Sequence, residues 1–199
     1  AADTGVAHFV YSSVGGADRN RAVSHVESKW QIEQYIQDLE LPATVLRPVF
    51  FMENLLGYGG PQPARDALLL RQALRPDTAL QMIAVDDIGA FAALAFADPD
   101  EYRGTQLELA GDELTGPQMA ELFGELTGMP TRYEQQPLEE VRAYSDDMAA
   151  MYEFFDNGGY QADIAQLRIR HPRLRSLRTW LAENCWTPPG TQPAAQATV

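Results

Sequence analysis

The chain has 199 residues, enough to bury the core of one domain or slightly more, and its formal net charge is −13. This acidic balance argues against a protein that binds nucleic acid or an anionic membrane surface, and the longest apolar stretch, residues 88–97, is too short to span a bilayer. A single cysteine, Cys185, excludes an internal disulfide and favours a cytoplasmic protein, and three scattered histidines indicate no metal site.

The first predicted elements are a strand and a long helix. Residues 8–13 form an apolar, β-branched and aromatic run, which is typical of a strand buried on both faces. The glycine pair at residues 15–16 predicts a turn. From Val23 the spacing becomes helical, and the predicted apolar face consists of Ile32, Tyr35, Ile36 and Leu39.

A polar stripe runs along the same predicted helix. His25, Lys29 and Glu33 are spaced four apart, so their side chains share one face. Lys29 is the only lysine of the chain, whereas every other residue of the Lys and Arg class is an arginine. A lysine amine is a compact positive charge, and burial can lower its pKa, which it cannot do for a guanidinium. Both properties suit a catalytic residue. The alternative is an exposed ion pair between Lys29 and Glu33.

A second buried strand is predicted at residues 43–51, with Pro48 ending it or forming a bulge. Open α/β sheets bind ligands beyond the carboxyl ends of their strands, and four residues occupy that place here: Phe51, Met52, Glu53 and Asn54. The alternative is an aromatic plug, with Asn54 capping the helix that follows.

In the middle of the chain, segments rich in glycine and proline alternate with short predicted strands and helices. The glycine- and proline-rich residues 57–63 predict a mobile loop, placed where it could form part of a substrate lid. Residues 68–74 and 78–85 flank a turn and form either a hairpin or two separate segments. Asp86 or Asp87 is expected to cap the helix at residues 88–97, and residues 105–110 predict a third strand of the main sheet.

The C-terminal part is predicted to be mostly helical. Thr115 and Gln118 form a capping box for a helix that ends before Gly128, and residues 131–135 are a short strand. Helices follow at residues 138–144 and 146–155. The second is rich in soft side chains, for which a core position is favoured over the wall of an apolar pocket: Met148, Met151, Tyr152, Phe154 and Phe155.

Five arginines then lie close together, and a solvated face that pairs with acidic residues is favoured over an anion site: Arg168, Arg170, Arg173, Arg175 and Arg178. Ser176 is expected to cap a last helix that ends at Asn184. Cys185 beside it reads as a packed side chain, and residues 187–199 as a disordered tail.

Four stretches, in order, carry a resemblance to a known family: HFVYSSVGGADR, SHVESKWQIEQYI, LRPVFFMENLL and MIAVDDIGAFAALAF. They resemble the NmrA-like family of atypical short-chain dehydrogenases/reductases over residues 2–186. The family's lysine matches Lys29, and His25 stands where ordinary short-chain dehydrogenases have a tyrosine. The resemblance implies catalytic roles for Lys29 and His25, and a cofactor-binding set of Ser12, Ser13, Lys29, Phe51, Met52, Glu53 and Asn54.

The same resemblance implies an α/β fold, namely the C-terminal part of a Rossmann-type doubly wound parallel sheet with a small α/β substrate-side subdomain. Residues 1–111 would belong to the NAD(P)-binding domain, residues 112–186 to the substrate side, and residues 187–199 to the tail. No glycine-rich phosphate loop stands between a strand and a helix, so we expect a piece of a longer protein that binds NADP or NAD once its N-terminal half is supplied.

The expected function is an NAD(P)H-dependent reductase that transfers hydride to a small aromatic or quinone-like acceptor. Two alternatives remain: a non-enzymatic NADP(H)-sensing regulator, and an incomplete fragment that binds no dinucleotide. The expected partner is a small-molecule substrate, without nucleic acid or membrane. A second copy of the chain, or a regulatory protein partner, is the further possibility, because a parallel sheet that has lost neighbouring strands has an unpaired edge.

Overall fold

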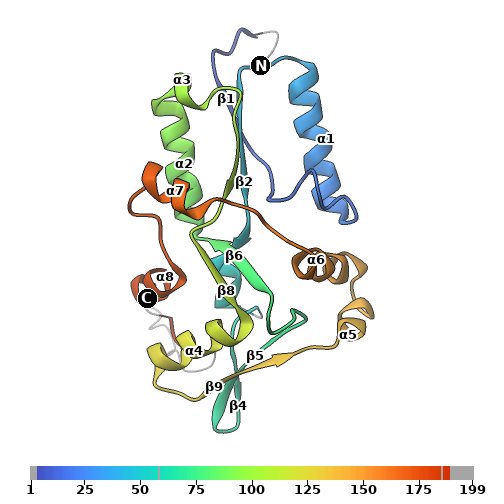
Figure 1. The fold of residues 1–199 in the computed structure, drawn as a ribbon, viewed down its shortest axis with the longest axis vertical. Coiled ribbons are helices and arrows are strands. Elements are labelled where there is room, and N and C mark those ends of the chain that lie inside the picture. The colour runs from blue at the N-terminus through green and yellow to red at the C-terminus, as the bar shows by residue number, and fades with distance from the viewer. Residues whose placement is uncertain (1–3, 58, 185, 189–199) are drawn as a thin grey trace, which may run out of the picture.

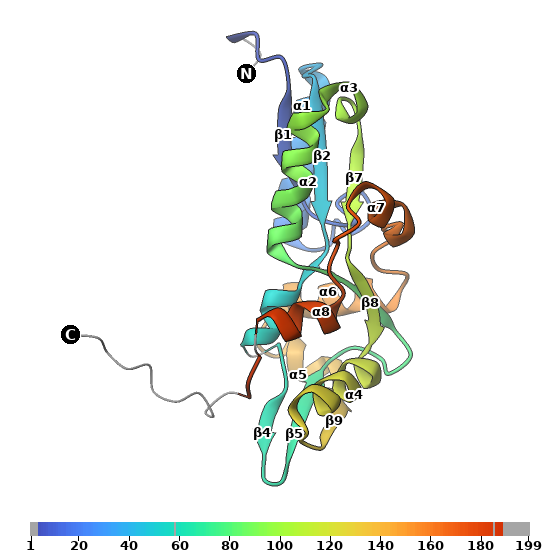
Figure 2. The ribbon, with the colours of Figure 1, turned by 90° about the vertical axis from the view of Figure 1, so that its left-hand side faces the viewer.

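The computed structural model describes residues 4–57, 59–184 and 186–188. Its first sheet is parallel and has the order β1-β2-β7, formed by β1 (Phe9–Ser12), β2 (Ala43–Pro48) and β7 (Gln106–Leu109). Helix α1 (Ser24–Asp38) lies on one face of this sheet and α2 (Val85–Ala97) on the other (Figures 1 and 2). A parallel sheet with helices on both faces confirms the predicted α/β class.

The three strands of this sheet differ in burial. All six residues of the central strand β2 are buried, whereas Phe9, Val10 and Tyr11 of β1 are only half-buried. Within the described residues, β1 pairs with β2 alone and so stands at an edge of the sheet. The prediction that the first strand is buried on both faces is therefore wrong, and the edge position explains it.

Pro48 ends β2, as its missing N–H predicts. One residue later the chain enters a second sheet as β3 (Phe50–Phe51), which is parallel to β6 (Ala79–Ile83); β6 in turn pairs antiparallel with β8 (Asp112–Thr115). The 3₁₀ helix η2 (Met52–Leu56) follows β3 directly. The predicted single strand over residues 43–51 is thus two strands in two sheets.

The third sheet contains β4 (Gln62–Ala64), β5 (Ala67–Gln72) and β9 (Thr131–Gln135), with β5 in the middle. Since β5 and β6 belong to different sheets, the segments around the predicted turn are not a hairpin. The turn itself is present, because the Thr78 N–H donates to the Arg75 carbonyl at 3.0 Å. Strand β4 begins inside the predicted loop of residues 57–63.

The remaining helices are short, and their caps are largely those the sequence predicts. They are α3 (Pro99–Tyr102), α4 (Gly116–Thr127), α5 (Leu138–Arg142), α6 (Asp146–Asp156), α7 (Ile164–Arg170) and α8 (Leu177–Glu183). Thr115 and Gln118 form the capping box of α4, Gly128 ends that helix with φ 68°, and Ser176 caps α8.

The apolar core has one large cluster in each half of the elongated molecule. Leu46, Phe91 and Leu109 pack between the first sheet and α2, and Met52, Phe123 and Trp180 pack where η2, α4 and α8 meet. Helix α1 contacts its neighbours differently from the prediction. Ile32, Tyr35 and Leu39 are 43%, 63% and 39% exposed, whereas the buried residues of α1 are Val26, Glu33 and Ile36.

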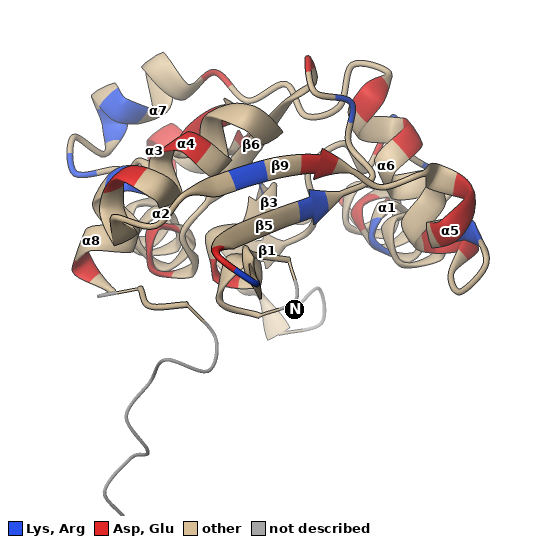
Figure 3. Ribbon diagram, turned by 90° about the horizontal axis from the view of Figure 1, so that it is seen from below, with Lys and Arg blue, Asp and Glu red and all other residues tan. Residues whose placement is uncertain are grey.

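Figure 3, seen from below, shows that positions of Lys or Arg and positions of Asp or Glu both occur along the helices and strands. The arginine-rich segment follows the predicted pattern of pairing with acidic residues: Arg170 contacts Glu101 at 3.0 Å, and Arg178 contacts Glu125 at 2.5 Å. No helix among the described residues has both the length and the apolar character needed to cross a bilayer. Cys185 and residues 189–199, for which packing and disorder are predicted, lie outside the described part.

The division into residues 1–111 and 112–186 stays a prediction. The strand that follows the proposed boundary, β8, pairs with β6 from the region before it. Either Asp86 or Asp87 is expected to cap α2, and neither does so, because both lie inside the first turn of the helix, which begins after Ala84 without a side-chain cap. The Asp87 carboxylate instead accepts hydrogen bonds from the backbone N–H and the guanidinium of Arg175, at 3.0 and 2.7 Å.

Candidate functional site

A cleft of about 370 Å³ opens at the carboxyl ends of β1 and β2. Ser12 and Ser13 contribute from the end of β1, residues 48–51 from the end of β2, and His25 and Lys29 from α1. This is the edge of a parallel sheet at which α/β proteins bind ligands. The structure therefore brings together, in one cleft, the serines and the helix residues that are far apart in the sequence.

Lys29 is held at the cleft by the backbone of β1. Its Nζ donates to the Ser12 carbonyl at 3.1 Å and lies 5.3 Å from the centre of the Tyr11 ring. Among the described residues, no carboxylate forms an ion pair with this amine. The interpretation of Lys29 as the ion-pair partner of Glu33 is therefore wrong, and a positive charge remains available at the cleft.

Glu33 has a different partner. Its carboxylate is fully buried and accepts from the Arg47 guanidinium of β2, with Nη2–Oε2 at 2.6 Å and Nε–Oε1 at 3.1 Å. Asp18 approaches Arg47 as well, at 3.4 Å. Burial acts to lower the pKa of Arg47, but hydrogen bonding and the charge of Glu33 outweigh it and raise that pKa. This pair fixes α1, and with it Lys29, against the sheet.

Two hydroxyls near Lys29 lack partners within the described structure. The Ser13 Oγ is buried, has no hydrogen bond, and belongs to a residue that lines the cleft. The Tyr11 hydroxyl is also buried and unpaired, and burial, followed by the charge of Glu33, raises its pKa. A buried hydroxyl without a partner is costly, so Ser13 is a position where a bound ligand would complete the hydrogen bonding.

The four residues after β2 divide into two pairs. Phe51 and Asn54 line the cleft, as the prediction of a cofactor contact requires. Met52 is fully buried in the core, and the Glu53 carboxylate accepts from the Val85 N–H at 3.0 Å and the Trp180 indole N–H at 3.2 Å. Asn54 lies within η2, so it does not cap that helix. Met52 and Glu53 therefore pack under the residues that line the cleft. That all four residues contact a cofactor stays a prediction.

A second, more apolar pocket of about 280 Å³ adjoins the cleft, and three residues line both: Phe50, Asn54 and Met151. The soft side chains of α6 form much of its wall, namely Met148, Met151, Tyr152 and Phe155. The favoured interpretation of α6 as core is thus incomplete. Phe155 is 5% exposed and belongs to the core, whereas Met148 is 38% exposed and borders the pocket.

Helix α6 is anchored to the start of α1. The Ser24 hydroxyl and N–H both donate to the Asp147 carboxylate. Hydrogen bonds from Ser24 lower the pKa of Asp147, and the positive charge of His25 lowers it further. His25 is exposed at this junction, on the rim of the cleft. The two helices that contribute side chains to the site therefore contact each other directly.

Sequence reasoning missed Tyr160, which lines the cleft, and Gln72, which lines the apolar pocket. Tyr160 contacts the glycine turn of residues 15–16: an added Cβ on Gly15 would lie 2.7 Å from its ring. Burial, followed by the charge of Glu108, raises the pKa of Tyr160. The signal that could have indicated Tyr160 is the glycine pair directly before it. Gln72 carried no local signal.

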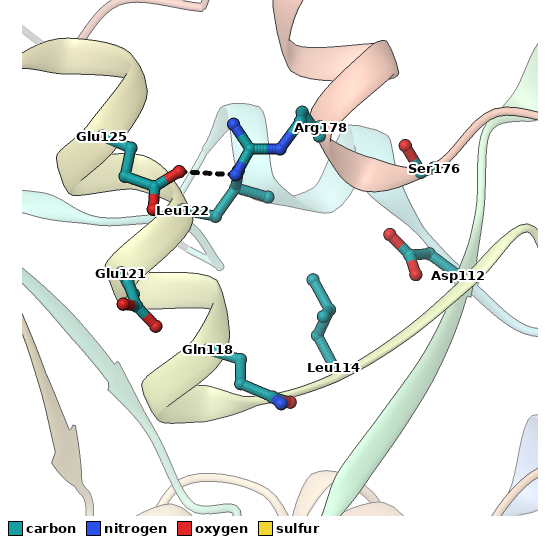
Figure 4. A pocket seen from close by; sticks show the side chains of 8 residues that line it. All are labelled: Asp112, Leu114, Gln118, Glu121, Leu122, Glu125, Ser176 and Arg178. Carbon is teal, nitrogen blue, oxygen red and sulfur yellow. Dashed lines mark hydrogen bonds and ion pairs between the residues drawn. The ribbon is translucent and has the colours of Figure 1, made fainter.

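Another hollow lies between α4 and α8 and is lined mainly by polar side chains (Figure 4). Three of its four charged side chains already have partners, because Arg178 pairs with Glu125 and the Asp112 carboxylate accepts from the Leu177 N–H at 2.8 Å. No three His, Cys, Asp or Glu side chains of the described residues are grouped so as to hold a metal ion. The cleft at β1 and β2 is therefore the stronger candidate site.

Comparison with known proteins shows the family to which the chain belongs. Residues 1–176 match the model of the NmrA-like family. The chain belongs to the NmrA-like family. One curated relative is the NmrA-like family domain-containing oxidoreductase malD of Malbranchea aurantiaca, which is 28% identical over 79% of this chain and 53% of its own length. The chain spans about half the length of the curated relatives it matches.

Two solved structures share the fold. An NADPH-dependent quinone oxidoreductase of Escherichia coli, complexed with NADPH, gives a TM-score of 0.75 at 20% identity, and covers 93% of this chain and 68% of its own. NmrA, a negative transcriptional regulator in complex with NADP, gives 0.72 at 19% identity, with 92% and 67% covered. Both establish the Rossmann-like architecture of this NmrA-like chain.

Proposed function

We propose that this chain supplies the nicotinamide side of an NAD(P)H-dependent reductase that transfers hydride to a small aromatic or quinone-like acceptor. The observation that carries the proposal is the position of Lys29: its amine is fixed on the Ser12 carbonyl at 3.1 Å, in a cleft that also contains the unpaired Ser13 hydroxyl. A positive charge beside free hydrogen-bonding groups suits the ribose and carboxamide of a nicotinamide dinucleotide.

The residues present fit such a cofactor. When bound, NADP or NAD supplies the hydride. Lys29 and Ser13 would hold its ribose and carboxamide groups, while Phe51 and Asn54 would bound the opposite side of the cleft. Lys29 would also stabilise negative charge that develops on the acceptor. His25, exposed at the rim, would deliver a proton from its imidazole.

Two further facts support a reductase. The apolar pocket shares Phe50, Asn54 and Met151 with the cleft, so an aromatic acceptor there would lie beside the cofactor. The oxidoreductase malD and the quinone oxidoreductase, both similar to this chain, carry activities of this class by name.

The first test is Lys29→Ala, made in the chain together with whatever its gene encodes before Ala1. We expect NADPH affinity and the rate of quinone reduction each to fall by about tenfold or more, because a fixed charge at the cofactor is lost. Fluorescence titration and NADPH consumption measure the two effects. Gln37→Ala, on the exposed side of the same helix, is the control. If both quantities stay within about twofold of wild type, Lys29 has no such role.

The second test is His25→Phe. We expect unchanged NADPH affinity but slower turnover and an altered pH dependence of the rate, because the proton donor is lost. Binding and rate must be measured on the same preparation, so that a folding defect, which would lower both, is recognised. An unchanged rate with an unchanged pH profile would remove His25 from the mechanism.

One observation favours a second function, that of an NADP(H)-sensing regulator. His25 stands where ordinary short-chain dehydrogenases have a tyrosine, and NmrA itself, whose structure with NADP is similar, is a negative transcriptional regulator by name. Tight NADPH binding without oxidation of NADPH by a panel of quinones and azo dyes would favour the regulator over the reductase.

A further inference from the structure

We propose that the apolar pocket beside the cleft recognises an aromatic ring that carries a hydrogen-bond donor, a hydroxyl or an N–H, through the side-chain oxygen of Gln72. The identity of this ligand as a hydride acceptor rests on the proposed function. The pocket itself, and the chemistry of the buried unpaired oxygen of Gln72, do not.

The orientation of Gln72 follows from its contacts. It is the last residue of β5, is 4% exposed, and lines the pocket. Its Nε2 donates to the Gly59 carbonyl at 3.0 Å, which requires an N–H and so distinguishes the two ends of the amide. Its Oε1 is buried and has no partner among the described residues. The free end of this side chain is therefore a pure acceptor.

The surroundings of Gln72 Oε1 provide few other groups that could bond to a polar ligand. The pocket that Gln72 lines has a mostly apolar wall, with Phe50, Leu80 and Phe155 among its members. The Tyr152 hydroxyl is already hydrogen-bonded to the backbone of Ala73. A buried acceptor without a donor is unfavourable, and a ligand donor removes that cost. The carbonyl oxygen of a quinone is itself an acceptor, so it cannot bond to Oε1, whereas a hydroxyl or amine on the ring can.

We therefore expect the affinity of the pocket for an aromatic ligand to depend on whether the ring carries a hydrogen-bond donor. Sites built to hydrogen-bond a hydroxyl reject analogues without it far more strongly than apolar pockets reject small changes of size. Aromatic acceptors that carry a hydroxyl or amino substituent should thus be preferred over methylated or methoxylated counterparts of the same shape.

The experiment compares two probes without nucleotide, 2-naphthol and 2-methoxynaphthalene, by isothermal titration calorimetry with the full chain. We expect wild type to bind 2-naphthol about tenfold more tightly. In Gln72→Leu and in Gln72→Met, this ratio should fall to within about twofold, with the affinity for 2-methoxynaphthalene unchanged. Gln135→Leu is the matched control, because Gln135 faces Gln72 in register on β9 but is exposed.

Equal affinities of the two probes for wild type would overturn the proposal, as would a preference that survives in both Gln72 variants. Failure of 2-naphthol to bind wild type would also overturn it. The comparison between probes in wild type needs no variant, so a misfolded Gln72→Leu protein leaves the test intact. NADPH is absent throughout, so these outcomes are independent of the Lys29 test of the proposed function.

Discussion

Glu33→Ala will lower the free energy of unfolding by about 3–5 kcal/mol, because it leaves the guanidinium of Arg47 buried without its main partner. The side chains of Glu33 and Arg47 are 0% and 7% exposed, and their closest atoms are 2.6 Å apart. Asp18, which also approaches Arg47, is 39% exposed and compensates little. Urea denaturation followed by circular dichroism measures the loss.

Two companion variants identify the cause. Gln37→Ala removes an exposed side chain from the same helix and should change stability by less than about 0.5 kcal/mol. The double variant Glu33→Leu with Arg47→Met removes both charges and should recover most of the loss, because a buried ion pair often contributes little over well-packed apolar side chains. A double variant as unstable as Glu33→Ala would show that packing, and not the unpaired charge, dominates.

Asp87→Asn will lower the free energy of unfolding by about 3 kcal/mol, since it removes the buried charge that holds Arg175. The Asp87 side chain is 1% exposed and accepts two hydrogen bonds from Arg175, with His171 Nε2 at 3.4 Å from Oδ1. This contact joins the first turn of α2 to the segment before α8. The asparagine keeps the shape of the side chain, so the measured loss reports the charge.

The neighbouring residue provides the control for this second prediction. Asp86 lies in the same first turn of α2 but is exposed, so Asp86→Asn should change stability by less than about 0.5 kcal/mol. Both variants alter the charge at the helix N-terminus equally. Equal losses would mean that the helix dipole, and not the Arg175 contact, is responsible.

What could be predicted from the sequence was largely local. The capping box of Thr115 and Gln118 acts over four residues, and the break at Pro48 follows from one missing N–H; both are confirmed. The errors arise where the partner is distant. Glu33 reads as part of an exposed stripe because Arg47 lies on another element, and Asp87 reads as a cap because Arg175 is far along the chain.

The same distinction applies to the candidate site. Local patterns place Ser12 and Ser13 at the end of a strand, and Lys29 and His25 on one helix face, whereas their expected roles came from the family resemblance. Gln72 was not predictable. Its role depends on the Gly59 carbonyl, on an unpaired oxygen and on the packing of α6, none of which leaves a pattern in the neighbouring sequence.

The connection from β2 to β3 has an evolutionary consequence. Strand β2 of the first sheet ends at Pro48, and strand β3 of the second begins at Phe50. Both residues line the cleft, as does Val49 between them, which is also 3% exposed and part of the core. Selection for a stable core and selection for a new ligand therefore act on the same three positions. Substitutions in this segment are constrained both by core stability and by ligand binding. Substitutions in the part of α6 that lines the pocket, where Met148 is 38% exposed, would therefore be the easier way for the family to change its ligands.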